Sequence, residues 1–165
     1  MRYIFLFIIL MSSLNLYSQT KVETENWIKS KFEKWKEDFK EPNIFNDRFK
    51  QLYIETPISI QFIGCEMIFK TSRRYELSSS VSKITYKINI GDIEELNWVD
   101  GFNLYISSRK TNIKSTFDNS DVRFTKGVAL SINIYAEENL KERLTKAINH
   151  LKSFCTQSKD EKEVF

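Results

Sequence analysis

The side chains that could perform catalysis in this 165-residue sequence are few and scattered. His150 is the single histidine. A general base or a triad member needs a nucleophile and an orienting acid held nearby. None of the patterns G-x-S-x-G, H-E-x-x-H or a Cys–His pair accompanies it. We therefore interpret His150 as a structural or solvent-facing residue.

Carboxylates occur in pairs at Glu94–Glu95 and Glu137–Glu138, and glycoside hydrolysis uses such pairs. Adjacent acids on a strand point to opposite faces, however, and acids before a helix favour its dipole, so we interpret both pairs as solvated acids. Asp118 and Asp121 flank a turn, but a calcium loop needs at least about six oxygen ligands. Two thiols and one distant histidine cannot complete a zinc site. We expect no catalytic residue, no metal and no cofactor.

Basic side chains at expected strand ends and turns are the candidates for ligand binding. They are Arg73, Arg74, Arg109, Lys110 and Lys114. If these turns meet in space, they form a patch beside Tyr75 and Tyr105 that could bind an anionic glycan, a lipid headgroup or an acidic protein surface. The alternative is that these bases protect strand edges against aggregation.

Composition narrows the class of protein. The chain has 25 Lys and Arg against 22 Asp and Glu, a net charge of +3, so a nucleic-acid partner is disfavoured. An aromatic content of 14% argues against a disordered chain. The glycines are isolated from one another, which excludes a glycine-rich phosphate loop. The length fits one domain.

The N-terminus is typical of a secretory signal peptide. Arg2 is followed by a run of nine apolar residues from Tyr3 to Met11 and then by small residues. We predict a signal peptide at residues 1–18 and a single domain at 19–165. Nine apolar residues are too few to span a bilayer, so this run is not expected to be a transmembrane helix. No transmembrane segment is expected after the leader is removed. The protein is predicted to be exported, periplasmic or secreted; the alternative is a buried N-terminal helix.

Export changes the interpretation of Cys65 and Cys155. In an oxidising compartment, two thiols are candidates for a disulfide. This bridge would close a loop of about 90 residues and stabilise the fold by roughly 4–5 kcal/mol at most. The alternative is that both are small buried apolar residues that never meet.

Two stretches have helical periodicity. Thr20 and Glu23 fit a capping box, and a helix is predicted from there to about Phe39. Its apolar stripe includes Trp35, with Trp27 beside it; we favour core packing for both tryptophans over a partner-binding face. A second helix is predicted from about 139 to 155, followed by a charged, frayed tail from about 157. Its stripe is Leu140, Leu144, Ala147, Ile148, Leu151 and Cys155.

Between the helices the apolar period becomes two. Alternation begins at Ile58, Gly64–Cys65 fits a tight turn, and Asp100–Gly101 fits a hairpin turn. These signals predict an α+β fold: an antiparallel meander of six or seven strands curling into a small barrel or sandwich, with an N-terminal amphipathic helix and a C-terminal capping helix. A flatter sheet with both helices on one side is the alternative.

This order of strands followed directly by an amphipathic helix resembles pleckstrin-homology-like domains. The phosphoinositide-binding signature of that superfamily places several Lys or Arg residues around the first hairpin. Here that hairpin is Phe62–Glu66, which contains no base. The resemblance therefore implies a fold and carries over no phosphoinositide site.

Several stretches resemble small exported proteins of Bacteroidetes-type bacteria that have no assigned function. They are Leu16–Gln19, Phe62–Cys65, Tyr86–Ile93 and Leu144–Cys155, with the Lys/Glu-rich tail that closes on Phe165. This likeness implies export and a single domain, and it carries over no catalytic residue.

The sequence thus predicts an exported, non-enzymatic binding or interaction module. Its partner would be an unknown protein or an anionic component of the cell envelope. One alternative is an envelope-associated binder of anionic lipid or glycan that uses the basic strand ends. Another is a hydrolase that uses scattered carboxylates.

Overall fold

The computed structural model describes residues 19–37, 44–46, 52–75, 80–99, 103–110, 112–118, 121–132 and 137–160. The predicted signal peptide, the Asp100–Gly101 turn and the last five residues of the predicted tail lie outside this part of the chain. The C-terminal helix continues to Asp160, past the predicted end at residue 155.

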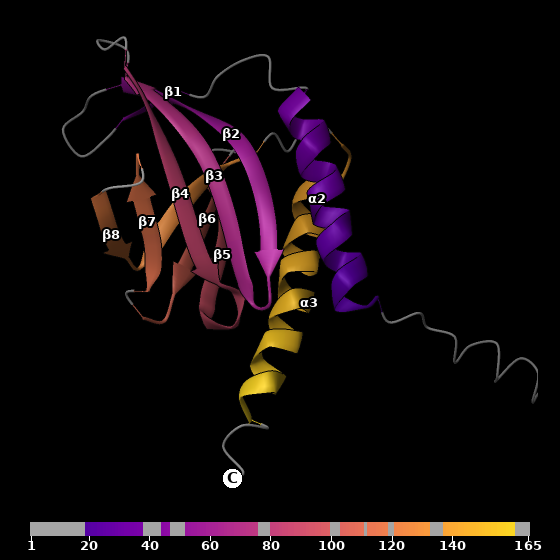
Figure 1. Ribbon diagram of the computed structural model, residues 1–165. Coiled ribbons are helices and arrows are strands. Elements are labelled where there is room, and N and C mark those ends of the chain that lie inside the picture. Colours follow the sequence, from indigo (N-terminus) through magenta and orange to yellow (C-terminus); the bar gives the residue numbers. More distant parts are fainter. Residues whose placement is uncertain are drawn as a thin grey trace, which may run out of the picture.

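The described strands form two antiparallel sheets (Figure 1). Sheet A has six strands in the order β1-β2-β3-β4-β7-β8, and sheet B has three in the order β5-β6-β9. The strands of sheet A are β1 (Ile44–Asn46), β2 (Leu52–Ile63), β3 (Glu66–Tyr75), β4 (Val81–Asn89), β7 (Ile113–Phe117) and β8 (Asp121–Thr125). Those of sheet B are β5 (Ile93–Val99), β6 (Asn103–Ser108) and β9 (Gly127–Ser131).

The α+β class and the antiparallel pairing are confirmed, but the single meander and the closure into a barrel are wrong for the described strands, which number nine and not the predicted six or seven. After β4, the short 3-10 helix η1 (Ile90–Asp92) leads the chain into sheet B for the β5–β6 hairpin. The chain then returns to sheet A for β7 and β8 and crosses again to sheet B for β9. The chain therefore passes three times between two sheets that remain separate.

The β2–β3 hairpin contains the predicted two-residue turn. Gly64 has φ +59°, a conformation that glycine adopts without a steric penalty. Strand β2 starts at Leu52, earlier than predicted, and runs through Pro57. Its register with β3 shifts between Pro57 and Ser59. A bulge accommodates proline within a strand because proline has no N–H to donate to the ladder.

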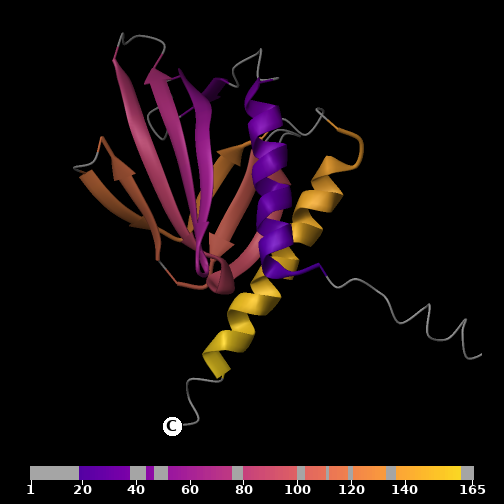
Figure 2. The same cartoon turned by 45° about the vertical axis from the view of Figure 1, so that its right-hand side comes forward.

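The helices α2 (Lys21–Glu37) and α3 (Leu140–Asp160) lie side by side at the open side between the two sheets (Figures 1 and 2). Thr20 and Glu23 form the reciprocal hydrogen bonds of a capping box at the start of α2. Phe32 of α2 packs edge-on against Phe69 of sheet A, with ring centroids 5.3 Å apart. The predicted apolar stripe of α3 is buried along its whole length, as expected for a core-facing helix.

The core lies where both helices meet both sheets. Side chains from α2, α3, β2, β3, β6 and β9 line one small enclosed space there, which is apolar throughout. Trp35 is buried in this core, as predicted, and Trp27 packs against it. Among the described residues, neither helix combines the length and apolar character needed to cross a membrane.

Cys65 and Cys155 lie at disulfide-bonding distance, with their Cα atoms 5.6 Å apart. The C-terminal half of α3 lies next to the β2–β3 hairpin, because η1 packs against this half of the helix. A Cβ added at Gly91 would lie 3.2 Å from the carbonyl oxygen of Cys155. The backbone N–H of Ile90 donates to the carbonyl oxygen of Cys65 at 2.9 Å. The hairpin, η1 and α3 therefore converge at one end of the molecule.

Candidate functional site

An open groove runs between α2 and α3 on the surface of the helical layer. Its volume is about 540 Å³. We call it the helix groove; its lining residues are Gln19, Trp27, Arg143, Lys146, Ala147 and His150.

The spacing of the α3 residues explains why they line one groove. Arg143, Lys146 and His150 recur at steps of three and four, which places them along one side of a helix. Leu144 and Ala147, each one position further on, belong to the buried stripe. The basic row therefore borders the core-facing stripe at the boundary where α2 packs against α3.

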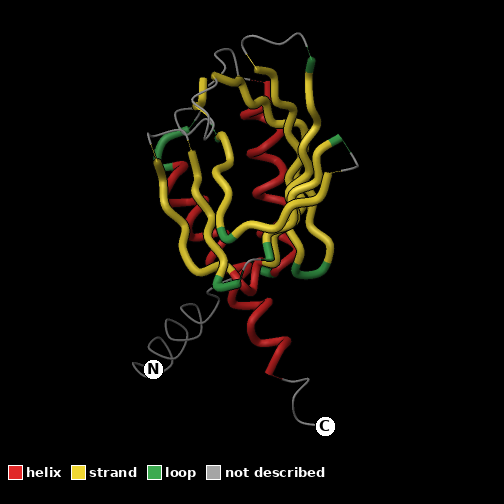
Figure 3. Tube along the Cα trace, turned by 90° about the vertical axis from the view of Figure 1, so that its left-hand side faces the viewer, coloured by secondary structure: helices red, strands yellow, loops and turns green. Residues whose placement is uncertain are grey.

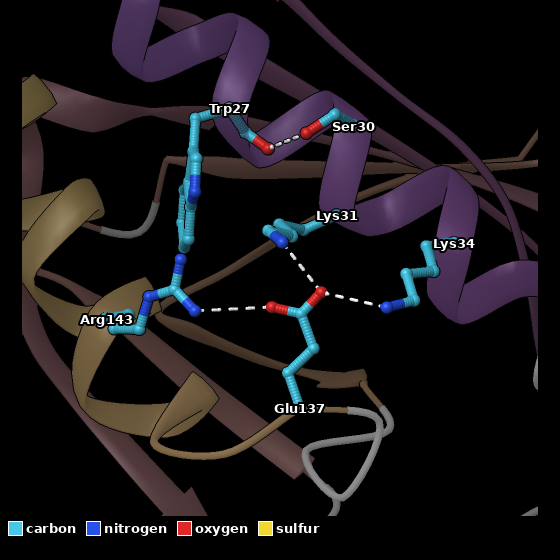
Figure 4. Close-up of polar contacts among 6 residues, drawn as sticks. All are labelled: Trp27, Ser30, Lys31, Lys34, Glu137 and Arg143. Atoms are coloured by element: carbon cyan, nitrogen blue, oxygen red, sulfur yellow. Dashed lines mark hydrogen bonds and ion pairs between the residues drawn. The ribbon is translucent and has the colours of Figure 1, made fainter.

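Glu137 is the centre of an ion-pair cluster at the rim of the helix groove (Figure 4). Its carboxylate lies 2.6 Å from Lys31 Nζ, 3.3 Å from Lys34 Nζ and 3.3 Å from Arg143 Nη1. The Glu137 side chain is only 13% exposed. The hydrogen bond from Lys31 is the main cause that lowers the pKa of Glu137 below its usual range, and Lys34 adds to it. With three bases to one acid, this Glu137 cluster carries a net positive charge.

Trp27 holds the guanidinium of Arg143 in place. The guanidinium carbon lies 5.1 Å from the centroid of the Trp27 ring, and Figure 4 shows the two groups next to each other. This cation–π distance is short enough for a favourable contact. The ion pair with Glu137 and the contact with Trp27 both orient the Arg143 side chain, 46% of which is exposed.

His150 contacts Gln19, the residue that precedes the capping box of α2. Its Nε2 lies 2.6 Å from the backbone carbonyl oxygen of Gln19. A carbonyl oxygen can only accept, so Nε2 carries the proton in this contact. The ring also packs edge-on against Phe154, at 4.9 Å between centroids. His150 thus makes structural contacts, as expected, and it also lines the groove.

The five bases predicted for ligand binding do not come together in one patch. Arg73 Nη2 pairs at 2.8 Å with Glu55, whose side chain is buried. Arg74 lies opposite Val81 at one end of β4, and Lys114 lies opposite Lys87 near the other. Six residues of strand separate these positions, about 20 Å. The ligand-binding role of these residues stays a prediction.

Arg109 and Lys110 are exposed and follow β6, at the same end of the molecule as η1. The backbone N–H of Arg109 donates to the carbonyl oxygen of Asp92 in η1 at 3.2 Å. These two residues therefore lie near the end of sheet A at which β7 begins, close to Lys114.

The predicted acidic candidates are largely engaged in local structure or exposed. Glu94 and Glu95 are both exposed, because the register of β5 shifts between Ile93 and Glu95. Asp118 Oδ1 accepts from the backbone N–H of Lys83 at 2.7 Å. No group of three or more potential metal ligands occurs among the described residues.

Glu137 departs from the sequence interpretation, which treated it with Glu138 as a solvated acid before a helix. Glu138 is exposed, but Glu137 is mostly enclosed by bases from two helices. The groove itself was not predicted. The available signal was the row of Arg143, Lys146 and His150 beside the stripe of α3, together with Trp27 beside the stripe of α2.

Comparison of the chain with family models, curated proteins and solved structures finds no match. The resemblances to small exported Bacteroidetes-type proteins and to pleckstrin-homology-like domains therefore remain predictions.

Proposed function

We propose that the chain is an exported, non-enzymatic binding module and that the helix groove holds an anionic group of its ligand. The observation that carries this proposal is the charge of the groove wall. Arg143 and Lys146 each place a positive charge on it, and none of its described lining residues is acidic. The signal-peptide pattern at residues 1–18 supports export.

Arg143 is the anchor for the anionic group. A guanidinium has five N–H donors, and only one terminal nitrogen is engaged by Glu137. The contact with Trp27 keeps the fork in one orientation, so less side-chain entropy is lost when a carboxylate or phosphate binds. Lys146 is exposed one turn further along α3 and supplies a second positive charge.

The residue types of the groove favour binding over catalysis. Its described lining includes no serine, cysteine, threonine or carboxylate that could act as a nucleophile. His150 uses Nε2 to contact a backbone carbonyl. The hydrolase alternative requires carboxylates that converge on a cleft. If the parent chain hydrolysed a substrate and replacement of a single acid abolished this activity, the result would support the hydrolase alternative against our proposal.

Amide-detected NMR titration of the chain from residue 19 onward tests the proposal, with inorganic phosphate and succinate as probes. We expect chemical-shift changes that cluster at the groove. Arg143→Gln and Lys146→Gln should each weaken binding by about tenfold, the effect of one charge-assisted hydrogen bond. Arg143→Gln removes one ion pair of Glu137 and could disturb folding. Lys146→Gln leaves the Glu137 cluster intact, so it tests the groove even if the Arg143 variant does not fold.

Lys141→Gln is the matched control, since Lys141 is exposed on α3 but does not line the groove. It removes the same charge from the same helix. If both probes shift residues elsewhere, or if Lys141→Gln weakens binding as much as Lys146→Gln does, the groove is not the anion site.

A further inference from the structure

Sheet A has one face against the core and one face that no described helix or strand covers (Figures 1 and 3). Side chains alternate between these faces along each strand. Phe69, Ile84, Tyr86 and Ile88 are buried on the inner face. Their strand neighbours therefore point to the other face, which we call the outer face.

The outer face is strongly basic. Cross-strand register places five bases on it: Lys70, Arg74, Lys83, Lys87 and Lys114. Glu66, which pairs with Lys87 at 3.4 Å, is the acid that shares this face within β2, β3, β4 and β7. Only Arg74 and Lys114 of this set belong to the basic residues singled out in the sequence.

Two of these lysines oppose each other directly. Lys87 of β4 is the cross-strand partner of Lys114 of β7. Like charges in this position destabilise a sheet. The next pair on the same face is Thr85 with Thr116, and Lys70 is the partner of Thr85 on the other side. Three ammonium groups and two hydroxyls thus adjoin on neighbouring strands, an arrangement that an external anion would stabilise.

Exposed apolar side chains lie on the same face as the bases. Phe124 of β8 is 58% exposed and is the cross-strand partner of Lys114. Val122, on the same strand, is 44% exposed. Ile63, beside the Gly64 turn, is 64% exposed, and Val81, opposite Arg74, is 54% exposed. Apolar groups that surround lysines fit a partner with both anionic and hydrocarbon parts.

We propose that the outer face docks the protein onto the surface of an anionic lipid bilayer. Lysine ammonium groups would contact lipid phosphates, while Phe124, Ile63 and Val122 would enter the boundary between headgroups and acyl chains. A polyanionic glycan would satisfy the lysines but offers no hydrocarbon to the aliphatic side chains. This docking surface is independent of the helix groove, whose residues belong to α2, α3 and the segment before α2.

Vesicle co-sedimentation of the chain from residue 19 onward tests the proposal. Vesicles of phosphatidylcholine alone are compared with vesicles that contain phosphatidylglycerol, at low and high salt. We expect binding only to the anionic vesicles, with loss at high salt. Lys87→Gln/Lys114→Gln should weaken it about thirty-fold, the contribution of two lysines near an anionic surface.

Phe124→Ser should weaken vesicle binding several-fold without changing the salt dependence, because it removes apolar and not charged contacts. Lys141→Gln/Lys152→Gln, which removes two charges from α3, is the matched control and should bind as the parent chain does. Replacing the lysine pair on sheet A removes the Lys87–Lys114 repulsion together with the exposed Lys87–Glu66 ion pair. These two small effects oppose each other, so we expect the variant to fold.

Equal vesicle binding by the Lys87→Gln/Lys114→Gln variant and the parent chain would overturn the proposal. So would binding to dextran sulfate without binding to anionic vesicles, which would assign the outer face to a polyanionic glycan. Arg143→Gln changes the helix groove and leaves the outer face intact, so it should bind vesicles as the parent chain does. The vesicle experiment therefore tests the outer face separately from the groove.

Discussion

The carboxylate of Glu137 lies 2.6 Å from the ammonium of Lys31, although 106 residues separate the two in sequence. Glu137 stands just before α3, and Lys31 lies in the second half of α2. This ion pair therefore ties the start of one helix to the other at the rim of the helix groove. Because Arg143 shares the same carboxylate, the pair also sets the position of the proposed ligand anchor.

Replacing this carboxylate should destabilise the fold. We expect Glu137→Gln to lower the free energy of unfolding at pH 7 by about 1–2 kcal/mol, because three bases lose their common partner and that partner is only partly exposed. Urea unfolding monitored by circular dichroism measures the change. Glu138→Gln, at the exposed neighbouring position, is the control and should change stability by less than about 0.5 kcal/mol.

The same cluster predicts a pH dependence. Hydrogen bonding by Lys31 lowers the pKa of Glu137 below its ordinary value of 4.5. A carboxyl whose pKa is lower in the folded state stabilises the fold above the unfolded-state pKa, and this contribution is lost as pH falls through the folded-state pKa. The stability difference between the parent chain and Glu137→Gln should therefore be full at pH 6 and shrink steadily below pH 4.5.

Unfolding curves collected from pH 7 to pH 3 check this prediction. Glu23, whose pKa the hydrogen bond from the backbone of Thr20 lowers, is present in both proteins, so its contribution cancels in the difference. A difference that stays constant down to pH 3 would mean that the ion pairs of Glu137 do not stabilise the fold.

The Cys65–Cys155 pair predicts a redox-dependent stability. Its sequence separation of 90 residues corresponds to about 4–5 kcal/mol of loop entropy, and measured effects of such bridges are often about 2–4 kcal/mol. We expect Cys65→Ala/Cys155→Ala to lose stability in that range. The parent chain should lose a similar amount when dithiothreitol is added, whereas the variant should not respond to the reductant.

Local patterns predicted much of this fold. The stripe from Leu140 to Cys155 and the Gly64–Cys65 turn both rely on neighbours in sequence, and each is confirmed. Strand β8 (Asp121–Thr125) was not predicted, although polar and apolar residues alternate along it. This segment is only five residues long and lies between two turns, and its apolar side chains Val122 and Phe124 are exposed rather than buried in the core.

The sheet order and the site depend on contacts that local patterns do not encode. Pairing of β4 with β7 skips the whole β5–β6 hairpin, so a meander was the wrong inference from correctly located strands. Gln19 and His150 are 131 residues apart. Residues beside a stripe can face solvent or a neighbouring helix, and which of these occurs depends on how α2 and α3 pack together.

The ring of Tyr105 lies over Gly127 at the start of β9. A Cβ added at Gly127 would approach Tyr105 Cε2 to 2.9 Å and the phenol oxygen more closely still. We therefore expect Gly127→Ala to displace the ring and to destabilise the fold by about 1–3 kcal/mol, the usual cost of overpacking. In a Tyr105→Ala background the same substitution should be neutral or stabilising, because alanine has less backbone entropy to lose than glycine. Urea unfolding of the four proteins of this double-mutant cycle gives the coupling energy, and additive effects would show that the ring does not constrain position 127.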